Sequence, residues 1–131
     1  MTARTLAKKI ADLALAKKAN DVLLMDLRKV TTTTDFFVLG SADSDTQVKA
    51  IADSIIEGTE SLGSRVWHTE GLQASVWVVL DYVDVVVHIF HKEERSFYNL
   101  ERLWGDAKIT EMRDELERAV KTGRLKSGKG R

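Results

Sequence analysis

The chain has 131 residues, 20 basic and 20 acidic side chains and a hydrophobic fraction of 44%, values typical of one globular domain. It contains no cysteine, which excludes disulfides, Cys-ligated zinc, iron–sulfur clusters and thiol catalysis. Because it has no apolar run near the ~18 residues of a membrane span and no apolar stretch typical of a secretory signal at its start, we expect a cytoplasmic protein with no membrane partner.

The first forty residues predict a helix followed by two strands. Apolar residues recur at helical spacing over residues 3–18, which indicates an amphipathic helix. Short apolar runs at 22–27 and 36–39 predict strands, and Gly40-Ser41 is expected to end the second strand.

The next segment carries the clearest helix signal in the sequence. Apolar residues recur at i, i+3, i+4, i+7 and i+8, which predicts a helix over residues 43–62. Ser41, Asp43 or Ser44 can cap its N-terminus. Gly63 suits its C-terminal stop.

The second half predicts three strands and two helices. Residues 66–68 are strand-like, and the runs at 76–80 and 85–90 are rich in β-branched residues and predict a hairpin. From Lys92 the pattern is helical, and a last helix is expected after Gly105-Asp106. The apolar faces of these two helices carry Phe97, Leu100 and Trp104, and then Ile109, Met112, Leu116 and Val120.

These elements predict an α/β domain with a mixed five-stranded sheet and flanking helices. The helix at 43–62 forms a strand–helix–strand crossover, which is expected to pair two strands in parallel, whereas the hairpins are antiparallel. We expect one domain over residues 1–121. Residues 122–131, rich in Gly, Ser, Lys and Arg, should form a frayed basic tail.

The turn at Gly40-Ser41 is the feature that suggests an enzyme. It lacks the P-loop and dinucleotide-binding patterns, and Asp43 and Asp45 would repel phosphate, so helix capping is the better interpretation. A metal-dependent nucleotidyltransferase needs carboxylates at i and i+2 on the following strand, and residues 66–70 have no such pair. A nucleotide-binding or nucleotidyl-transferring enzyme that uses this turn is the alternative hypothesis.

The three histidines give no support for a metal or catalytic site. His88 and His91 are three apart in a predicted strand, so they point to opposite faces. His68 and Glu70 can share a face, but two ligands make a weak metal site. For His88, which lies in an apolar run, a hydrogen-bonded structural role is the favoured interpretation. We expect no metal and no cofactor.

The net charge of zero conceals an acidic middle. Residues 20–91 have four basic and eleven acidic side chains, a net charge of −7. Trp77 is out of phase with its valine neighbours and should face away from them, and Tyr82 lies with Asp81 and Asp84 at the hairpin turn. An exposed Trp and Tyr beside carboxylates would suit a basic protein partner. The alternative is that Trp77 belongs to the core.

The C-terminal end is basic. Residues 118–131 hold six basic and no acidic side chains, so they could contact RNA phosphates. A solvated tail is the alternative interpretation. The acidic middle argues against a nucleic-acid surface on the sheet.

Several motifs in this sequence resemble the Iojap family, also called the ribosomal silencing factors (RsfS). The resemblance covers residues 5 to 107 and is carried by Asp26, Thr34–Val38, Gln47–Asp53, Glu70-Gly71, Trp77–Phe90 and Arg95–Trp104. The most specific part is the long Trp77–Phe90 motif, followed by Tyr-x-Leu-Glu-x-Leu-Trp.

The resemblance implies a nucleotidyltransferase-like fold without the catalytic carboxylates, and therefore no enzymatic activity. It implies binding to the large ribosomal subunit through the universal ribosomal protein numbered fourteen, where the small subunit docks. The bound factor would block subunit joining and repress translation when nutrients are short. A homodimer and a peripheral contact of the basic tail with ribosomal RNA are also expected.

The family motifs also imply a set of partner-binding residues: Trp77, Asp81, Tyr82 and Asp84, with Glu70 and His88 as neighbours. A second group has a structural or an interface role: Tyr98, Leu100, Glu101 and Trp104. Val83 departs from the family pattern, which usually has glycine there, and valine disfavours a positive φ.

Overall fold

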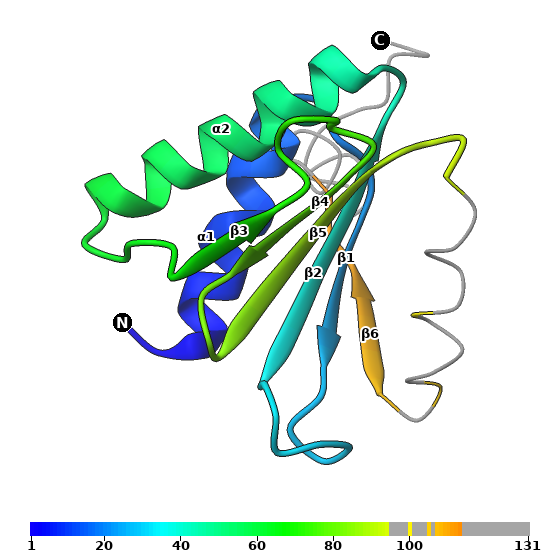
Figure 1. Ribbon diagram of the computed structural model, residues 1–131. Helices are drawn as coiled ribbons and strands as arrows, with labels where there is room; N and C mark the ends of the chain where they lie inside the picture. The colour runs from blue at the N-terminus through cyan, green and yellow to red at the C-terminus, as the bar shows by residue number, and fades with distance from the viewer. Residues whose placement is uncertain (95–99, 101–104, 106, 114–131) are drawn as a thin grey trace, which may run out of the picture.

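Two helices cover one face of a six-stranded sheet in the computed structural model, which describes residues 1–94, 100, 105 and 107–113 (Figure 1). The helices are α1 (Ala3–Ala16) and α2 (Asp45–Ser61). The strands are β1 (Asn20–Asp26), β2 (Phe36–Ala42), β3 (His68–Glu70), β4 (Trp77–Asp81), β5 (Val85–His91) and β6 (Lys108–Glu111). The expected α/β class with a mixed sheet is confirmed, with six strands instead of five.

The ends of α2 follow from local hydrogen bonds. Of the three candidate caps, Ser44 has the role, because its side chain accepts a hydrogen bond from the Gln47 N–H at 3.1 Å. At the other end Gly63 has φ +88°, and its N–H donates to the Glu60 carbonyl. The expected glycine stop is therefore confirmed.

The strand order is β3-β4-β5-β2-β1-β6, and β2 with β5 is its one parallel pair among the described strands. The expectation that the crossover through α2 pairs its own two strands is wrong. The chain passes from β2 through α2 to β3 at the far edge, and the β4–β5 hairpin then fills the space between them. The parallel partner of β2 is therefore β5, the second strand of the hairpin that follows β3.

The segment Lys108–Glu111 is a strand, not the start of the expected last helix. It pairs antiparallel with β1, with Asp26 opposite Lys108 and Leu23 opposite Glu111. The outer edge of β1 offers main-chain groups that need hydrogen-bond partners, and this demand outweighs a helical spacing of apolar residues. Leu100 has helical backbone. Met112 directly follows β6, and its N–H donates to the Val22 carbonyl. Residues 122–131 lie outside the described residues, as do six residues that the sequence analysis named: Phe97, Tyr98, Glu101, Trp104, Leu116 and Val120.

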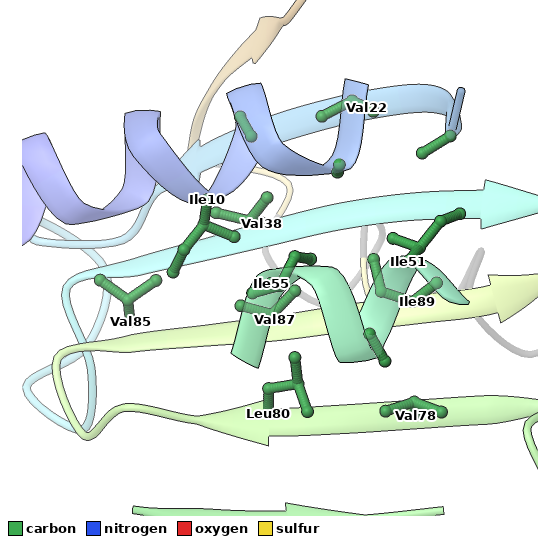
Figure 2. Close-up of a cluster of buried hydrophobic side chains, with 14 of the residues drawn as sticks. Ile10, Val22, Val38, Ile51, Ile55, Val78, Leu80, Val85, Val87 and Ile89 are labelled. Atoms are coloured by element: carbon green, nitrogen blue, oxygen red, sulfur yellow. The ribbon is translucent and has the colours of Figure 1, made fainter. Parts of the chain in front are cut away.

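The core lies between the helices and the sheet. Figure 2 shows Ile51 and Ile55 of α2 above Val87 and Ile89 of β5. These four side chains have no exposed surface. Burying apolar side chains of this size contributes about 1.5–3 kcal/mol each, which fixes the sheet against its helices and leaves its other face to carry different residues.

Candidate partner-binding face

We call the face of the sheet opposite α1 and α2 the open face (Figure 1). Strand alternation and register place most of the candidate partner-binding residues on it. In β4, Val78 and Leu80 are buried under the helices. The alternate residues Trp77, Val79 and Asp81 therefore lie on the open face. The expectation that Trp77 faces away from Val78 is confirmed.

Strand register brings the candidate residues into neighbouring rows. Asp81 stands opposite His68 of β3. One row along, Val79 stands between Glu70 of β3 and His88 of β5. The candidates that share the open face are therefore Glu70, Trp77, Asp81 and His88.

Trp77 lies on an aromatic cluster. Its Nε1–H donates a hydrogen bond to His88 Nδ1 at 3.1 Å, and its ring centroid is 5.2 Å from that of Phe90. Phe37 meets the His88 ring edge-on at 4.7 Å. Trp77 is half-buried, so part of its indole packs on a second apolar cluster on this face while the rest faces solvent. The buried members of this cluster are Met25, Leu27, Leu39 and Phe90, and Leu23, Phe37, Leu100 and Ala107 also pack against it. Trp77 is therefore neither a fully exposed residue nor a fully buried core residue.

His88 holds Trp77 in place. It is 7% exposed, and burial lowers its pKa to about 4, so the imidazole is neutral at pH 7. Because Nδ1 accepts the indole hydrogen bond, the proton of the neutral ring is on Nε2. This agrees with the structural role that an apolar run predicts for a histidine, and it makes His88 a positioning residue for Trp77.

Tyr82 is buried, so the expectation that its ring lies near solvent is wrong. It is 9% exposed, and its hydroxyl is 2.7 Å from Thr59 Oγ1 on α2. Thr59 donates its own hydroxyl proton to the Ile55 carbonyl, so Tyr82 is the donor in this pair. Burial raises the pKa of Tyr82. Side chains in β4 alternate between the two faces of the sheet, and Tyr82 is in phase with the buried Val78 and Leu80. Its ring therefore points toward the helices, although it lies at the hairpin turn.

The hairpin turn is held in an uncommon conformation. Val83 has φ +76°, and the Asp84 N–H donates to the Tyr82 carbonyl across it at 3.0 Å, which makes a γ-turn of the positive-φ kind. Asp81 Oδ1 accepts the Val83 N–H at 2.7 Å and stabilises the turn. Asp84 is exposed at the tip of the turn.

Replacing Val83 by glycine is expected to raise the free energy of unfolding by about 1 kcal/mol. A β-branched residue is strained at positive φ, and the relief exceeds the backbone entropy that glycine adds to the unfolded chain. Urea denaturation measures the change. Val83→Ala is the control, because alanine keeps most of the φ strain. Equal stabilisation by alanine and glycine would show that φ strain is not the cause.

The sequence analysis did not single out Trp67. Its side chain is 71% exposed, the highest value among the large hydrophobic residues that the structure describes. Its N–H donates to the Asp81 carbonyl at 2.9 Å, which fixes its backbone beside β4. A tryptophan next to a short edge strand was the signal in the sequence, but periodicity alone does not say whether such a residue is buried.

The Gly40-Ser41 segment does not form a phosphate-binding turn. β2 continues through both residues to Ala42, so the expectation that they end the strand is wrong. Ser41 is buried, with its hydroxyl donating to the Asn20 carbonyl, and a Cβ at Gly40 would contact Ile89 Cδ1 at 3.4 Å. Among the residues that the structure describes, no group of three or more His, Asp or Glu side chains could hold a metal ion.

No helix in the described ranges has the length and apolar content to cross a bilayer.

A sequence model of the family described as "Ribosomal silencing factor during starvation" matches residues 1–129. The chain is 44% identical over 96 residues to the ribosomal silencing factor RsfS of Bacillus subtilis. These aligned residues cover 73% of this chain and 81% of the Bacillus protein.

Two further comparisons extend this similarity. A mouse protein named "Mitochondrial assembly of ribosomal large subunit protein 1" is 28% identical over 98 residues, covering 72% of this chain and 43% of its own length. A crystal structure of a Chromobacterium violaceum protein superposes with a TM-score of 0.76 at 30% identity, covering 80% of this chain and 88% of that one. The family match over nearly the whole chain and the shared fold show that this chain belongs to the Iojap/RsfS family of ribosomal silencing factors.

Proposed function

We propose that this chain binds the large ribosomal subunit through its universal ribosomal protein fourteen, blocks docking of the small subunit and so represses translation under nutrient limitation. The observation that carries the proposal is Trp77, an indole fixed by His88 and only half-buried on the open face. A rigid, partly exposed tryptophan is typical of the anchors that dominate protein interfaces.

The charge around this anchor suits a basic partner. The strands β3, β4 and β5 contain no lysine or arginine. Glu70 and Asp81 lie on the open face, and Asp84 is exposed at the turn. Carboxylates around an aromatic anchor attract a basic ribosomal protein and orient it during encounter. The name of the mouse relative supports the large subunit as the site of action.

To block docking of the small subunit, the protein needs affinity for the large subunit and sufficient size, but no reactive group. This mechanism fits a family that is named for silencing. The names of the relatives indicate a regulatory factor rather than an enzyme. Homodimerisation, the contact of residues 122–131 with ribosomal RNA and the cytoplasmic location stay predictions. Tyr82 leaves the proposed contact set because its side chain is buried against α2.

Asp81→Lys is expected to weaken binding to purified large subunits about 100-fold, because a like-charge contact at an interface costs several kcal/mol. Co-sedimentation with large subunits measures the affinity, and the yield of joined ribosomes after small subunits are added measures occlusion. Both should fall together if binding on the open face blocks joining.

Asp53→Lys is the matched control, since it makes the same charge change on α2, where the Asp53 side chain is 46% exposed and paired with Lys49. It should leave binding unchanged. Circular dichroism checks that both variants fold. Equal affinities of the wild type, Asp81→Lys and Asp53→Lys would exclude the open face as the binding surface.

A further inference from the structure

A hollow of about 530 Å³ lies at the turn end of the open face. Three separate segments meet there: the loop at 31–34, the hairpin turn at Val83, and Trp67 before β3. We call it the Trp67 pocket, and its lining residues are Thr31, Thr33, Thr34, Phe37, Trp67, Asp81, Val83, Val86 and His88.

Two apolar residues of the lining, Trp67 and Val83, are exposed, and their main chain is held by hydrogen bonds. Trp67 is 71% and Val83 is 55% exposed, values that are unusual for such side chains. The backbone of each is bonded to Asp81, since the Trp67 N–H donates to its carbonyl oxygen and the Val83 N–H to its carboxylate. The main chain of these two residues therefore needs little ordering when a partner arrives, which favours affinity.

The polar part of the lining has one sign of charge. Asp81 is the charged residue among the lining residues, because burial keeps His88 neutral at pH 7. Thr34 Oγ1 and His88 Nε2 are both buried and have no hydrogen-bond partner among the described residues, and both carry a proton that they could donate. Since Asp81 carries the one formal charge among the lining residues, the pocket favours a partner group of positive charge, which a carboxylate binds with charge-assisted hydrogen bonds.

We propose that the Trp67 pocket receives one lysine or arginine side chain of the partner protein. The methylene stem packs on Trp67 and Val86, and the cationic group reaches the Asp81 carboxylate. Lysine and arginine combine an apolar stem with a charged end, which matches apolar walls beside a single carboxylate. This inference rests on the proposed function and adds Trp67 as a second anchor beside Trp77.

The test measures the affinity of labelled protein for purified large ribosomal subunits. Trp67→Ala is expected to weaken binding about tenfold or more, as loss of an interface tryptophan does. Leu62→Ala is the matched control, because Leu62 is 47% exposed at the end of α2, and it should leave the affinity unchanged. Trp67 is mostly solvated, so its loss leaves the fold intact.

Two further variants identify the occupant. Asp81→Asn keeps a side-chain oxygen for the Val83 N–H but removes the charge, so it should weaken binding about fivefold and flatten its salt dependence. Trp67→Arg should weaken binding more than Trp67→Ala, because it repels a cation. Tighter binding by Trp67→Arg would overturn the proposal in favour of an RNA phosphate, and an unchanged affinity of Asp81→Asn would overturn it in favour of an apolar occupant.

The outcomes separate this inference from the proposed function. If the wild type does not bind large subunits, the proposed function fails. If the wild type binds and Asp81→Lys and Trp77→Ala abolish binding while Trp67→Ala stays within twofold, the open face is the interface and the Trp67 pocket is empty.

Discussion

Replacing Gly71 by alanine is expected to lower the free energy of unfolding by about 3 kcal/mol or more. Gly71 has φ +81°, where an L side chain is strained. A Cβ there would also collide with the main-chain oxygen of Trp77, which cannot move without displacing β4. Since Trp77 anchors the proposed interface, we expect weaker subunit binding as well. Thermal or urea unfolding measures the stability.

Gly63→Ala is the control that isolates the collision. Gly63 has φ +88°, almost the same strain, but a Cβ there meets no atom within 4 Å. Its replacement should cost about 1 kcal/mol, which is the conformational penalty alone. If both variants lose the same stability, the close approach of Gly71 to Trp77 is energetically unimportant and this prediction is wrong.

Ile55→Ala is expected to lower the free energy of unfolding by about 2–5 kcal/mol, because it removes a fully buried side chain between α2 and the sheet and leaves a cavity (Figure 2). The same helix turn accepts the Thr59 hydroxyl, which receives the hydrogen bond of Tyr82. Loss of packing at Ile55 should therefore also loosen the hairpin turn.

Ile109→Ala is the matched control for Ile55→Ala. Ile109 is 43% exposed on the edge strand β6, so its truncation should cost less than about 1 kcal/mol. Urea denaturation of both variants gives the comparison. A loss at Ile109 as large as that at Ile55 would mean that burial under α2 is not what stabilises the domain.

The sequence predicted the elements whose signals are local. The helical spacing over 43–62 and the Ser44 cap determine α2, and the β-branched runs determine the β4–β5 hairpin. The alternation of side chains correctly predicted that Trp77 and Val78 lie on different faces of the sheet. The same alternation could have placed Tyr82 correctly, because it is in phase with Leu80. For Tyr82, the alternation of side chains along the strand predicts burial better than its position at a turn predicts exposure.

Other features depend on contacts between distant segments. Ile109 and Met112 fit a helical spacing, but Ile109 lies in a strand because β1 has an unpaired edge. The parallel partner of β2 was set by the hairpin that follows β3 and not by α2 itself. Hydrogen bonding between strands satisfies main-chain groups whatever the side chains are, so residue patterns cannot identify the partner.

The division is clearest at the proposed interface. Composition and motifs alone determined an acidic middle segment, its aromatic residues and the family to which they belong. Only the tertiary structure decided which aromatic side chains a partner can reach: Tyr82 is buried against Thr59, Trp77 is half-buried on His88, and Trp67 is exposed beside Asp81. Exposure depends on what packs against a side chain from elsewhere in the chain, and one residue's type and neighbours do not contain that information.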